Sequence, residues 1–373
     1  MRDYFKKGSF TFVFPIDGDC INSNDGAAAE EGIKIEARVK ADAETLSICG
    51  VKAEKRGDEF VAEIIIKDGK NTLTVESAVE KQSITVYRFK KAEKGYRVSS
   101  DDNILFLKDI NDNKDKYESI FENPYLAGYK QAHDECGAKV QLNLFYETAD
   151  LDGFANPIEY FNLSMMTDKF KDEFRANSDW LKLSFHARKE NPSHPYKNDP
   201  AEVIATDLTA VNREIVRFAG EECLSVGTTI HFGAASEESV RKAKELGYDA
   251  LAGYFELYVD GSPLVSYFYP IDLILHVGER DFWVDNELGI FYARIDRVMN
   301  YDKEPEKNIA ALEEVMKNPG RNEFFEVMIH EQYFYSDYVN YIPAFREIVV
   351  GTCEWLKERG YTPRFMEEVY GEN

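Results

Sequence analysis

Three histidines and one pair of aspartates each come directly after a short run with the pattern of a β-strand. The runs and the residues that follow them are 96–100 with Asp101 and Asp102, 183–185 with His186, 228–230 with His231, and 327–329 with His330. Imidazole nitrogens and carboxylate oxygens are usual ligands of Zn²⁺ and similar ions, and the same groups serve as catalytic acids and bases. These residue types therefore predict a site for metal-assisted hydrolysis.

The two neighbouring aspartates suit two different tasks. Successive residues at the end of a strand point in different directions. One carboxylate can therefore bind a divalent metal ion while the other stays free as a base. The ion activates a water molecule, the free carboxylate takes the proton of that water, and a histidine across the site protonates the leaving group.

Alternating strands and helices in residues 96–373 would bring these residues together. The patterns predict strands at 104–110, 139–145, 181–185, 226–230 and 324–329, and helices at 122–136, 202–220, 236–246 and 342–359. Repeated strand-then-helix units over this length are typical of an α/β fold with a parallel (β/α) barrel. The carboxyl ends of the strands form the active-site face of such a barrel, which is where the aspartates and histidines fall. His276 is expected to end a further strand.

Residues 1–92 have a different pattern, with short runs of period-two alternation and no helical stretch. This pattern predicts a small all-β, immunoglobulin-like sandwich. Asp68-Gly69-Lys70-Asn71 is expected to form a tight hairpin turn between two of its strands. The charged stretch 90–95 is the expected linker to the second domain at 96–373. We expect the sandwich to pack against its neighbour, with a carbohydrate-binding role as the alternative.

Composition and charge exclude several classes of partner. The chain has 45 Lys and Arg against 68 Asp and Glu, a formal net charge of −23. This charge argues against binding to nucleic acid or to an anionic membrane surface. No run of about 18 apolar residues that could span a bilayer occurs, and the charged start of the chain has no secretion signal, so we expect a cytoplasmic location. The five scattered cysteines are expected to be reduced and mostly buried.

Residues 96–373 resemble the polysaccharide deacetylase superfamily, a group of metal-dependent carbohydrate esterases with distorted (β/α) barrels. The resemblance rests on Ser99–Asn103, Leu183–His186, His231–Ser236, Glu326–His330 and the closing helix at Trp355–Tyr361, in that order. It implies removal of N- or O-linked acetyl groups from a carbohydrate. It also implies that Asp101 is the base, Asp102 and His186 bind the metal, and His330 is the acid. The implied cofactor is one divalent ion, zinc first, with cobalt, nickel or manganese as alternatives.

The sequence departs from this family in its second and third motifs. The second motif normally has another histidine a few residues on, whereas the next one here is His194, eight residues after His186. The third motif normally has an Arg-Pro pair that orients the base, and His231 stands in its place. His231 and His194 therefore compete for the third ligand position. We favour His231 because it follows a strand, and the long insertion between Tyr254 and Asn322 indicates a divergent branch.

Four further residues are candidates for substrate contact or support. Tyr146 and Glu147 follow a predicted strand, Glu331 could hold the ring of His330, and Trp283 lies in the insertion. Two other functions stay open. A glycoside hydrolase would use Asp101 with Glu331 or Glu147 as its carboxylate pair, but the histidines would then have no role. A catalytically silent carbohydrate-binding protein would fit the altered motifs.

Overall fold

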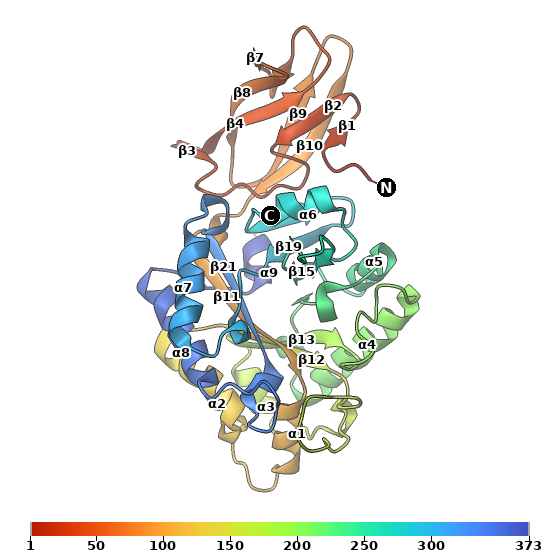
Figure 1. Ribbon diagram of the computed structural model, residues 1–373, viewed down its shortest axis with the longest axis vertical. Helices are drawn as coiled ribbons and strands as arrows, with labels where there is room; N and C mark the ends of the chain where they lie inside the picture. The colour runs from red at the N-terminus through yellow and green to blue at the C-terminus, as the bar shows by residue number, and fades with distance from the viewer. Residues whose placement is uncertain (1, 372–373) are drawn as a thin grey trace.

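The computed structural model describes residues 2–371, and its amino-terminal part consists of two antiparallel sheets (Figure 1). One sheet has the order β1 (Lys6–Lys7), β2 (Phe10–Phe14), β4 (Gly32–Lys40), β8 (Glu59–Ile66), β7 (Glu54–Arg56), with β3 (Gly26–Ala29) paired to β4. The other has the order β10 (Lys81–Arg88), β9 (Gly69–Glu76), β5 (Ser47–Ile48), β6 (Val51–Lys52). Alternate residues of these strands are buried in one shared hydrophobic cluster, as the period-two pattern predicts.

The predicted hairpin turn at Asp68–Asn71 is wrong. The strand before it, β8, pairs with β4 and β7, whereas the strand after it, β9, pairs with β10 and β5 in the other sheet. The side chain of Asn71 accepts a hydrogen bond from the backbone N–H of Lys67 and donates one to its carbonyl. This local turn carries the chain from one sheet to the other. The residues 68–71 therefore do form a turn, but the strands on its two sides do not pair with each other.

The remainder of the chain is a mixed α/β structure built on parallel strands. One sheet has the order β13 (Leu181–Ala187), β12 (Val140–Phe145), β11 (Gly95–Asn103), β21 (Phe324–His330), β20 (Arg297–Val298), with β22 (Thr362–Pro363) beside β11. A second has the order β14 (Gly227–Thr228), β15 (Ala250–Gly253), β19 (Ile290–Arg294), β18 (Phe282–Asp285), and only β18 runs antiparallel to its neighbour. A small hairpin, β16 (Glu256–Leu257) and β17 (Pro263–Leu264), follows β15.

The two sheets meet at both ends. The hydroxyl of Ser184 on β13 donates to the carbonyl of Gly227 on β14 at 2.8 Å. At the other end the chain continues from β19 into β20, and the N–H of Asp296 donates to the carbonyl of Glu326 on β21. Segment 290–298 thereby links the outer part of one sheet to the outer part of the other.

Nine α-helices lie among the described residues. They are α1 (Leu105–Asp112), α2 (Pro124–Cys136), α3 (Lys171–Ala176), α4 (Ala201–Phe218), α5 (Glu237–Glu245), α6 (Ile271–Val277), α7 (Pro305–Met316), α8 (Phe345–Glu358) and α9 (Met366–Tyr370). Local sequence sets their ends. Asn123 caps α2, Pro124 occupies its first position, and Gly137 ends it with φ 73°, a backbone angle that glycine adopts freely. Helix α2 packs beside α8, and α4 beside α5 (Figure 1).

Two predicted strands are helices in the structure. The apolar run 104–110 forms α1, in which Leu105, Phe106, Leu107 and Ile110 are buried and the carboxylate of Glu331 caps the first turn. Short apolar runs do not distinguish strand from helix. The residues before His276 form α6, and the ring Nε2 of His276 lies 2.6 Å from Oδ1 of Asp19.

The amino-terminal sheets lie at the end of the molecule opposite the carboxyl ends of β11 and β21 (Figure 1). Arg280 donates to the carboxylate of Asp25, and the indole N–H of Trp283 donates to the carbonyl of Asp17. The expected linker at 90–95 is a short 3-10 turn, Lys90–Ala92, whose Ala92 is buried in the contact between the two parts. The five cysteines are free, and all but Cys49 are buried.

None of the helices in residues 2–371 has the length and apolar character needed to cross a membrane.

Candidate metal centre and active site

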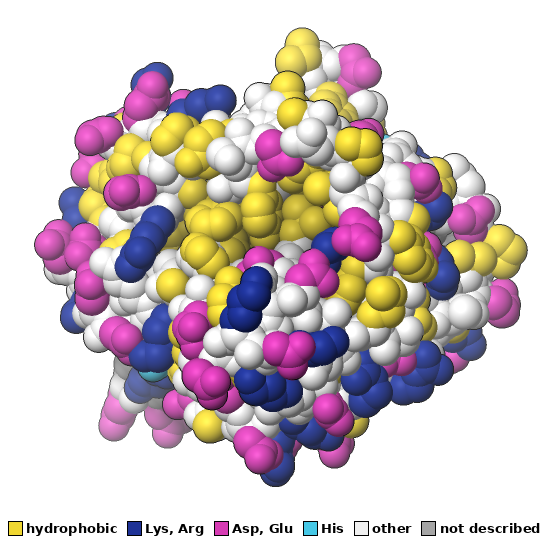
Figure 2. All heavy atoms as spheres, turned by 90° about the horizontal axis from the view of Figure 1, so that it is seen from below, with side chains coloured by type: hydrophobic (Ala, Val, Ile, Leu, Met, Phe, Trp, Pro, Cys, Tyr) yellow, Lys and Arg dark blue, Asp and Glu magenta, His cyan; other side chains and the backbone are white. Residues whose placement is uncertain are grey.

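The strand ends gather the predicted residues around one pocket. Asp101 and Asp102 lie just before the end of β11, His186 is the last residue but one of β13, His330 ends β21, and His231 begins a short 3-10 turn after β14. The pocket has a volume of about 270 Å³. Its lining residues are Asp101, Asp102, His186, Glu190, Thr229, His231, Phe232, Gly233, Tyr254, Tyr258, Leu264, Val265, Tyr301, Met328, His330, Gln332, Tyr333 and Tyr338. Figure 2 views the end of the molecule at which β11 and β21 finish and shows a hollow lined mainly by hydrophobic side chains.

Both aspartates reach the pocket although they are neighbours on a strand. Asp102 has φ 62°, a left-handed conformation that is uncommon for a residue other than glycine. The pairing of β11 with β12 also shifts its register between Ser100 and Asn103. These two local departures from a regular strand place two successive side chains at the same pocket, where a regular strand would send them to opposite faces. Such strain is often found at functional sites.

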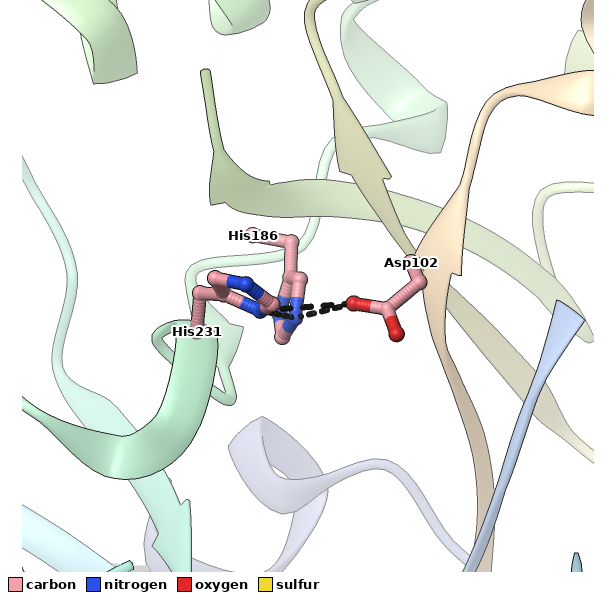
Figure 3. Close-up of side chains that lie close together, drawn as sticks. All are labelled: Asp102, His186 and His231. Atoms are coloured by element: carbon pink, nitrogen blue, oxygen red, sulfur yellow. Dashed lines mark hydrogen bonds and ion pairs between the residues drawn. The ribbon is translucent and has the colours of Figure 1, made fainter. Parts of the chain in front are cut away.

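Asp102, His186 and His231 form a buried cluster whose ligand atoms all lie within 4.8 Å of one another (Figure 3). Oδ1 of Asp102 is 3.0 Å from Nε2 of His186 and 3.3 Å from Nδ1 of His231. The two ring nitrogens are themselves 3.0 Å apart. One carboxylate oxygen and two imidazole nitrogens on three different elements therefore converge on a single point.

The hydrogen bonds of the two rings determine which nitrogens can bind a metal. Nδ1 of His186 lies 2.5 Å from the carbonyl of Thr229, and Nε2 of His231 lies 3.1 Å from the carbonyl of Glu190. A carbonyl only accepts, so these nitrogens bear hydrogens, and the two facing nitrogens are the ones that can bind a metal ion. Oδ1 of Asp102 is buried and receives no hydrogen bond from the described residues. A cation between the three acceptor atoms satisfies all of them, so the residues fit a divalent metal ion.

The charges around the cluster favour a cation. Burial alone would raise the pKa of Asp102, but His186, His231 and His330 hold it well below its usual value, so the carboxylate stays ionised. Burial also disfavours a charged His186, yet Asp101 and Asp102 raise the pKa of its ring to about 9, so these carboxylates hold a proton here that a metal ion would replace. The amide of Gln332 donates to the second oxygen of Asp102 at 2.9 Å and fixes the orientation of that carboxylate.

Asp101 and His330 lie in the same pocket, outside the cluster. The buried carboxylate of Asp101 accepts a hydrogen bond from Nδ2 of Asn143 at 2.6 Å. Nδ1 of His330 lies 2.8 Å from Oδ1 of Asn300, which also accepts from the backbone N–H of His330. The other ring nitrogen of His330, Nε2, lies 4.0 Å from Oδ2 of Asp102. The expected base and acid are partners across β11 and β21, and both line the pocket beside the cluster.

Glu331 does not hold the ring of His330, contrary to expectation. Its carboxylate accepts from the backbone N–H groups of Ile104, Leu105 and Phe106 at 2.6, 2.9 and 2.6 Å, and from the hydroxyl of Tyr335. Burial nevertheless raises the pKa of Glu331 to about 7. Its role is to cap α1.

The other three support candidates also lie outside the pocket lining. Glu147 pairs with Arg188 and accepts from the hydroxyl of Tyr160, and the ring of Tyr146 packs against the same arginine. Trp283 is buried against the amino-terminal part.

The structure separates the two histidines that compete for the third ligand position. His231 belongs to the cluster, whereas the ring of His194 stacks on Phe232 with centroids 4.6 Å apart. Sequence reasoning did not identify Glu190, Gln332 or Asn300. Gln332 is two residues after His330 and Glu190 four after His186, so proximity to a predicted site residue was the available signal. No such signal existed for Asn300, because Asn300 lies in the long insertion and contacts His330 only in the folded structure.

No protein-family model matches this chain, and no curated protein gives a significant match. Among solved structures, it is similar to a family 4 acetyl xylan esterase from Clostridium thermocellum in complex with a cobalt ion, at 12% identity over 74% of this chain and 90% of that one, with a TM-score of 0.38. It is similar to a CE4 family pseudoenzyme from Bacillus anthracis at 12% identity over 74% of this chain, spanning 66% of that structure, with a TM-score of 0.34. It is also similar to a 4-alpha-glucanotransferase from Thermococcus litoralis at 11% identity over 75% and 40% of the two chains, with a TM-score of 0.46. At these values none of the three assigns a fold or an activity to this chain.

Proposed function

We propose that this protein is a metal-dependent hydrolase that removes N- or O-linked acetyl groups from a carbohydrate. The observation that carries the proposal is the convergence of three possible ligand atoms, from Asp102, His186 and His231, in a pocket that also contains Asp101 and His330. A base, an acid and a cation site around one pocket are the parts that hydrolysis of an acyl bond needs.

We also propose a specific fold for each of the two parts of the chain. Residues 96–373 form a distorted (β/α) barrel, supported by the contacts of Ser184 with Gly227 and of Asp296 with Glu326, which join the two sheets at both ends. Residues 1–92 form an immunoglobulin-like sandwich, supported by the two antiparallel sheets that share one cluster. Its contacts with 280–283 support a packing role.

Asp102, His186 and His231 would hold one divalent ion. A set of two imidazoles and one carboxylate suits zinc first, and also cobalt, nickel or manganese. When bound, the ion would supply Lewis acidity toward an acyl carbonyl and a water molecule. Gln332 would keep Asp102 oriented, and the carbonyls of Thr229 and Glu190 would keep both rings in the ligating tautomer.

The proton transfers would be made by Asp101 and His330. The carboxylate of Asp101 takes a proton from the attacking water as its oxygen forms a bond to the acetyl carbon. The bond from that carbon to the sugar nitrogen or oxygen then breaks, and Nε2 of His330 gives its proton to the leaving atom. The products are acetate and the free amine or alcohol. Asn300 accepts from Nδ1 of His330 and so directs Nε2 to the pocket.

Aromatic side chains around the pocket support a carbohydrate substrate. The aromatic residues that line the pocket are Phe232, Tyr254, Tyr258, Tyr301, Tyr333 and Tyr338. Of these, Phe232, Tyr258 and Tyr301 are exposed. Such rings offer flat apolar faces for the C–H faces of sugars and hydroxyls for their polar edges.

The test is to load the full chain with zinc and incubate it with a panel of N- and O-acetylated oligosaccharides, measuring both acetate and new reducing ends. The proposal expects acetate without reducing ends, and loss of that activity in Asp101→Asn at unchanged metal content. New reducing ends without acetate would overturn it in favour of a glycoside hydrolase. Binding without any product from the zinc-loaded protein would overturn it in favour of a silent binding protein.

A further inference from the structure

A buried row of polar side chains leads through the interior to Asp101. Arg97 on β11 and Gln141 and Asn143 on β12 are fully buried, and Asp101 is 1% exposed. Nη1 of Arg97 is 3.3 Å from Oε1 of Gln141, Nε2 of Gln141 is 2.7 Å from Oδ1 of Asn143, and Nδ2 of Asn143 is 2.6 Å from Oδ1 of Asp101. The proposed chemistry gives this row no other task, and neither Gln141 nor Asn143 lines the pocket.

The direction of every hydrogen bond in this row follows from Arg97. A guanidinium only donates, so Gln141 must turn its carbonyl oxygen to Arg97, and the hydroxyl of Ser225 donates to that same oxygen at 3.0 Å. The amide nitrogen of Gln141 then faces Asn143, whose carbonyl oxygen accepts from it, and the backbone carbonyl of Gly227, which also accepts from it at 2.8 Å and so requires the same orientation. The amide nitrogen of Asn143 is left to face Asp101 as a donor.

We infer that Asn143 is the positioning residue of the catalytic base, and that Gln141 sets which end of the Asn143 amide faces the base. This inference rests on the proposed function, in which Asp101 is the base. Asn143 holds one oxygen of Asp101, and no hydrogen bond from residues 2–371 holds the other, which is free to take the proton of water. Glu326 keeps Arg97 in place, with its carboxylate 2.9 Å from Nε of the guanidinium.

The test uses two variants and one control in the full, zinc-loaded chain. Asn143→Leu keeps the branched shape of the side chain and removes the donor. Gln141→Glu replaces the donor to Asn143 by an acceptor, so the Asn143 amide should turn over and present oxygen to Asp101. Ser184→Ala is the control, because Ser184 lies opposite Asn143 in the sheet and loses a buried hydrogen bond without touching Asp101.

Both variants should lower kcat for acetate release by about 10–100-fold, the size of effect usual for a residue that orients a site group. KM should change by less than about twofold and zinc content should equal that of the wild type, since neither residue touches substrate or metal. Ser184→Ala should keep its kcat. A kcat for Asn143→Leu equal to that of the control would overturn the inference, and so would a loss of zinc that accounts for the lower rate.

Crystal structures of the zinc-loaded wild type and Asn143→Leu give a readout that does not depend on activity. The inference expects the Asp101 carboxylate to bond Asn143 in the wild type and to rotate in the variant. An unchanged Asp101 would overturn it. A wild type that releases no acetate refutes the proposed function alone, because the structural comparison still decides whether Asn143 holds Asp101.

Discussion

Nε2 of His186 and Nδ1 of His231 lie 3.0 Å apart, and both face Oδ1 of Asp102. Without a metal ion, the proton that the raised pKa keeps on His186 lies among these three atoms. Asp102 adds a negative charge at the same point. A metal ion that binds at this point must displace that proton, so metal binding is coupled to pH.

Removal of a ligand should abolish metal retention without unfolding the chain. Asp102→Ala and His186→Ala should each lose the ion on dialysis against buffer, because a chelating set of three loses a third of its donors and its charge balance. Elemental analysis of the purified variants measures the metal, and the thermal unfolding midpoint measured with chelator measures the fold.

Asp101→Asn is the matched control for Asp102. It changes the neighbouring carboxylate, which lines the same pocket but lies outside the ligand cluster, and should keep the metal. Full metal occupancy in Asp102→Ala would refute the assignment of this residue as a ligand.

His231 and His194 should differ sharply in their effect on metal affinity. His231→Ala removes a cluster atom and should weaken zinc binding by more than the about 10–100-fold typical of a residue that only supports a ligand. His194→Ala removes a ring that stacks on Phe232 and should leave the affinity within about twofold. Competition with a zinc chelator measures both. The reverse order of effects would place His194 in the ligand set and His231 outside it.

The strand-end residues could be predicted because the parallel strands place their carboxyl ends on one face. The runs before Asp101, His186 and His330 are strands in the structure, and their ends meet at one pocket. His231 was found for the same reason, although β14 is only two residues long and His231 begins a 3-10 turn.

The interior polar residues could not be assigned from the sequence. Gln141 and Asn143 alternate with apolar residues, a pattern that equally describes a strand with one face in water. In this fold both faces of β12 are buried, so the same alternation places the amides inside. Likewise, nothing near Glu331 in the sequence indicates that its partners are backbone groups at 104–106, which it meets only after the chain has folded.

Asp101 and His330 should affect turnover without affecting the metal. Asp101→Asn and His330→Gln should each lower kcat for acetate release by about 10²–10⁴-fold, the usual contribution of a positioned base or acid. Asn300→Leu should have a smaller effect of about 10-fold or more, because it removes the acceptor that directs the His330 ring. Kinetics with parallel metal analysis separates the three. Full activity in His330→Gln would show that another group donates the proton.

Glu331 should make the stability of the metal-free protein depend on pH. Its pKa is raised from 4.5 to about 7 by burial, so between these pH values the folded state holds a proton that the unfolded state has lost. Stability must then fall as pH rises through this window, by up to about 1.4 kcal/mol per pH unit for one proton. Glu331→Gln cannot ionise and should lose this slope, although it weakens the cap of α1 at every pH.

The measurement is the thermal unfolding midpoint of wild type and Glu331→Gln with chelator at pH 5, 6, 7 and 8. The midpoint of the wild type relative to the variant should decrease from pH 5 to 7 and then level off, because both states are ionised above the folded pKa. Tyr335→Phe offers a second check, since the hydroxyl that it removes lowers the pKa of Glu331. The pH at which the unfolding midpoint stops decreasing should therefore be higher in Tyr335→Phe. A difference between wild type and Glu331→Gln that stays constant from pH 5 to 8 would mean that Glu331 is ionised throughout, with its charge stabilised by the three backbone N–H groups of α1.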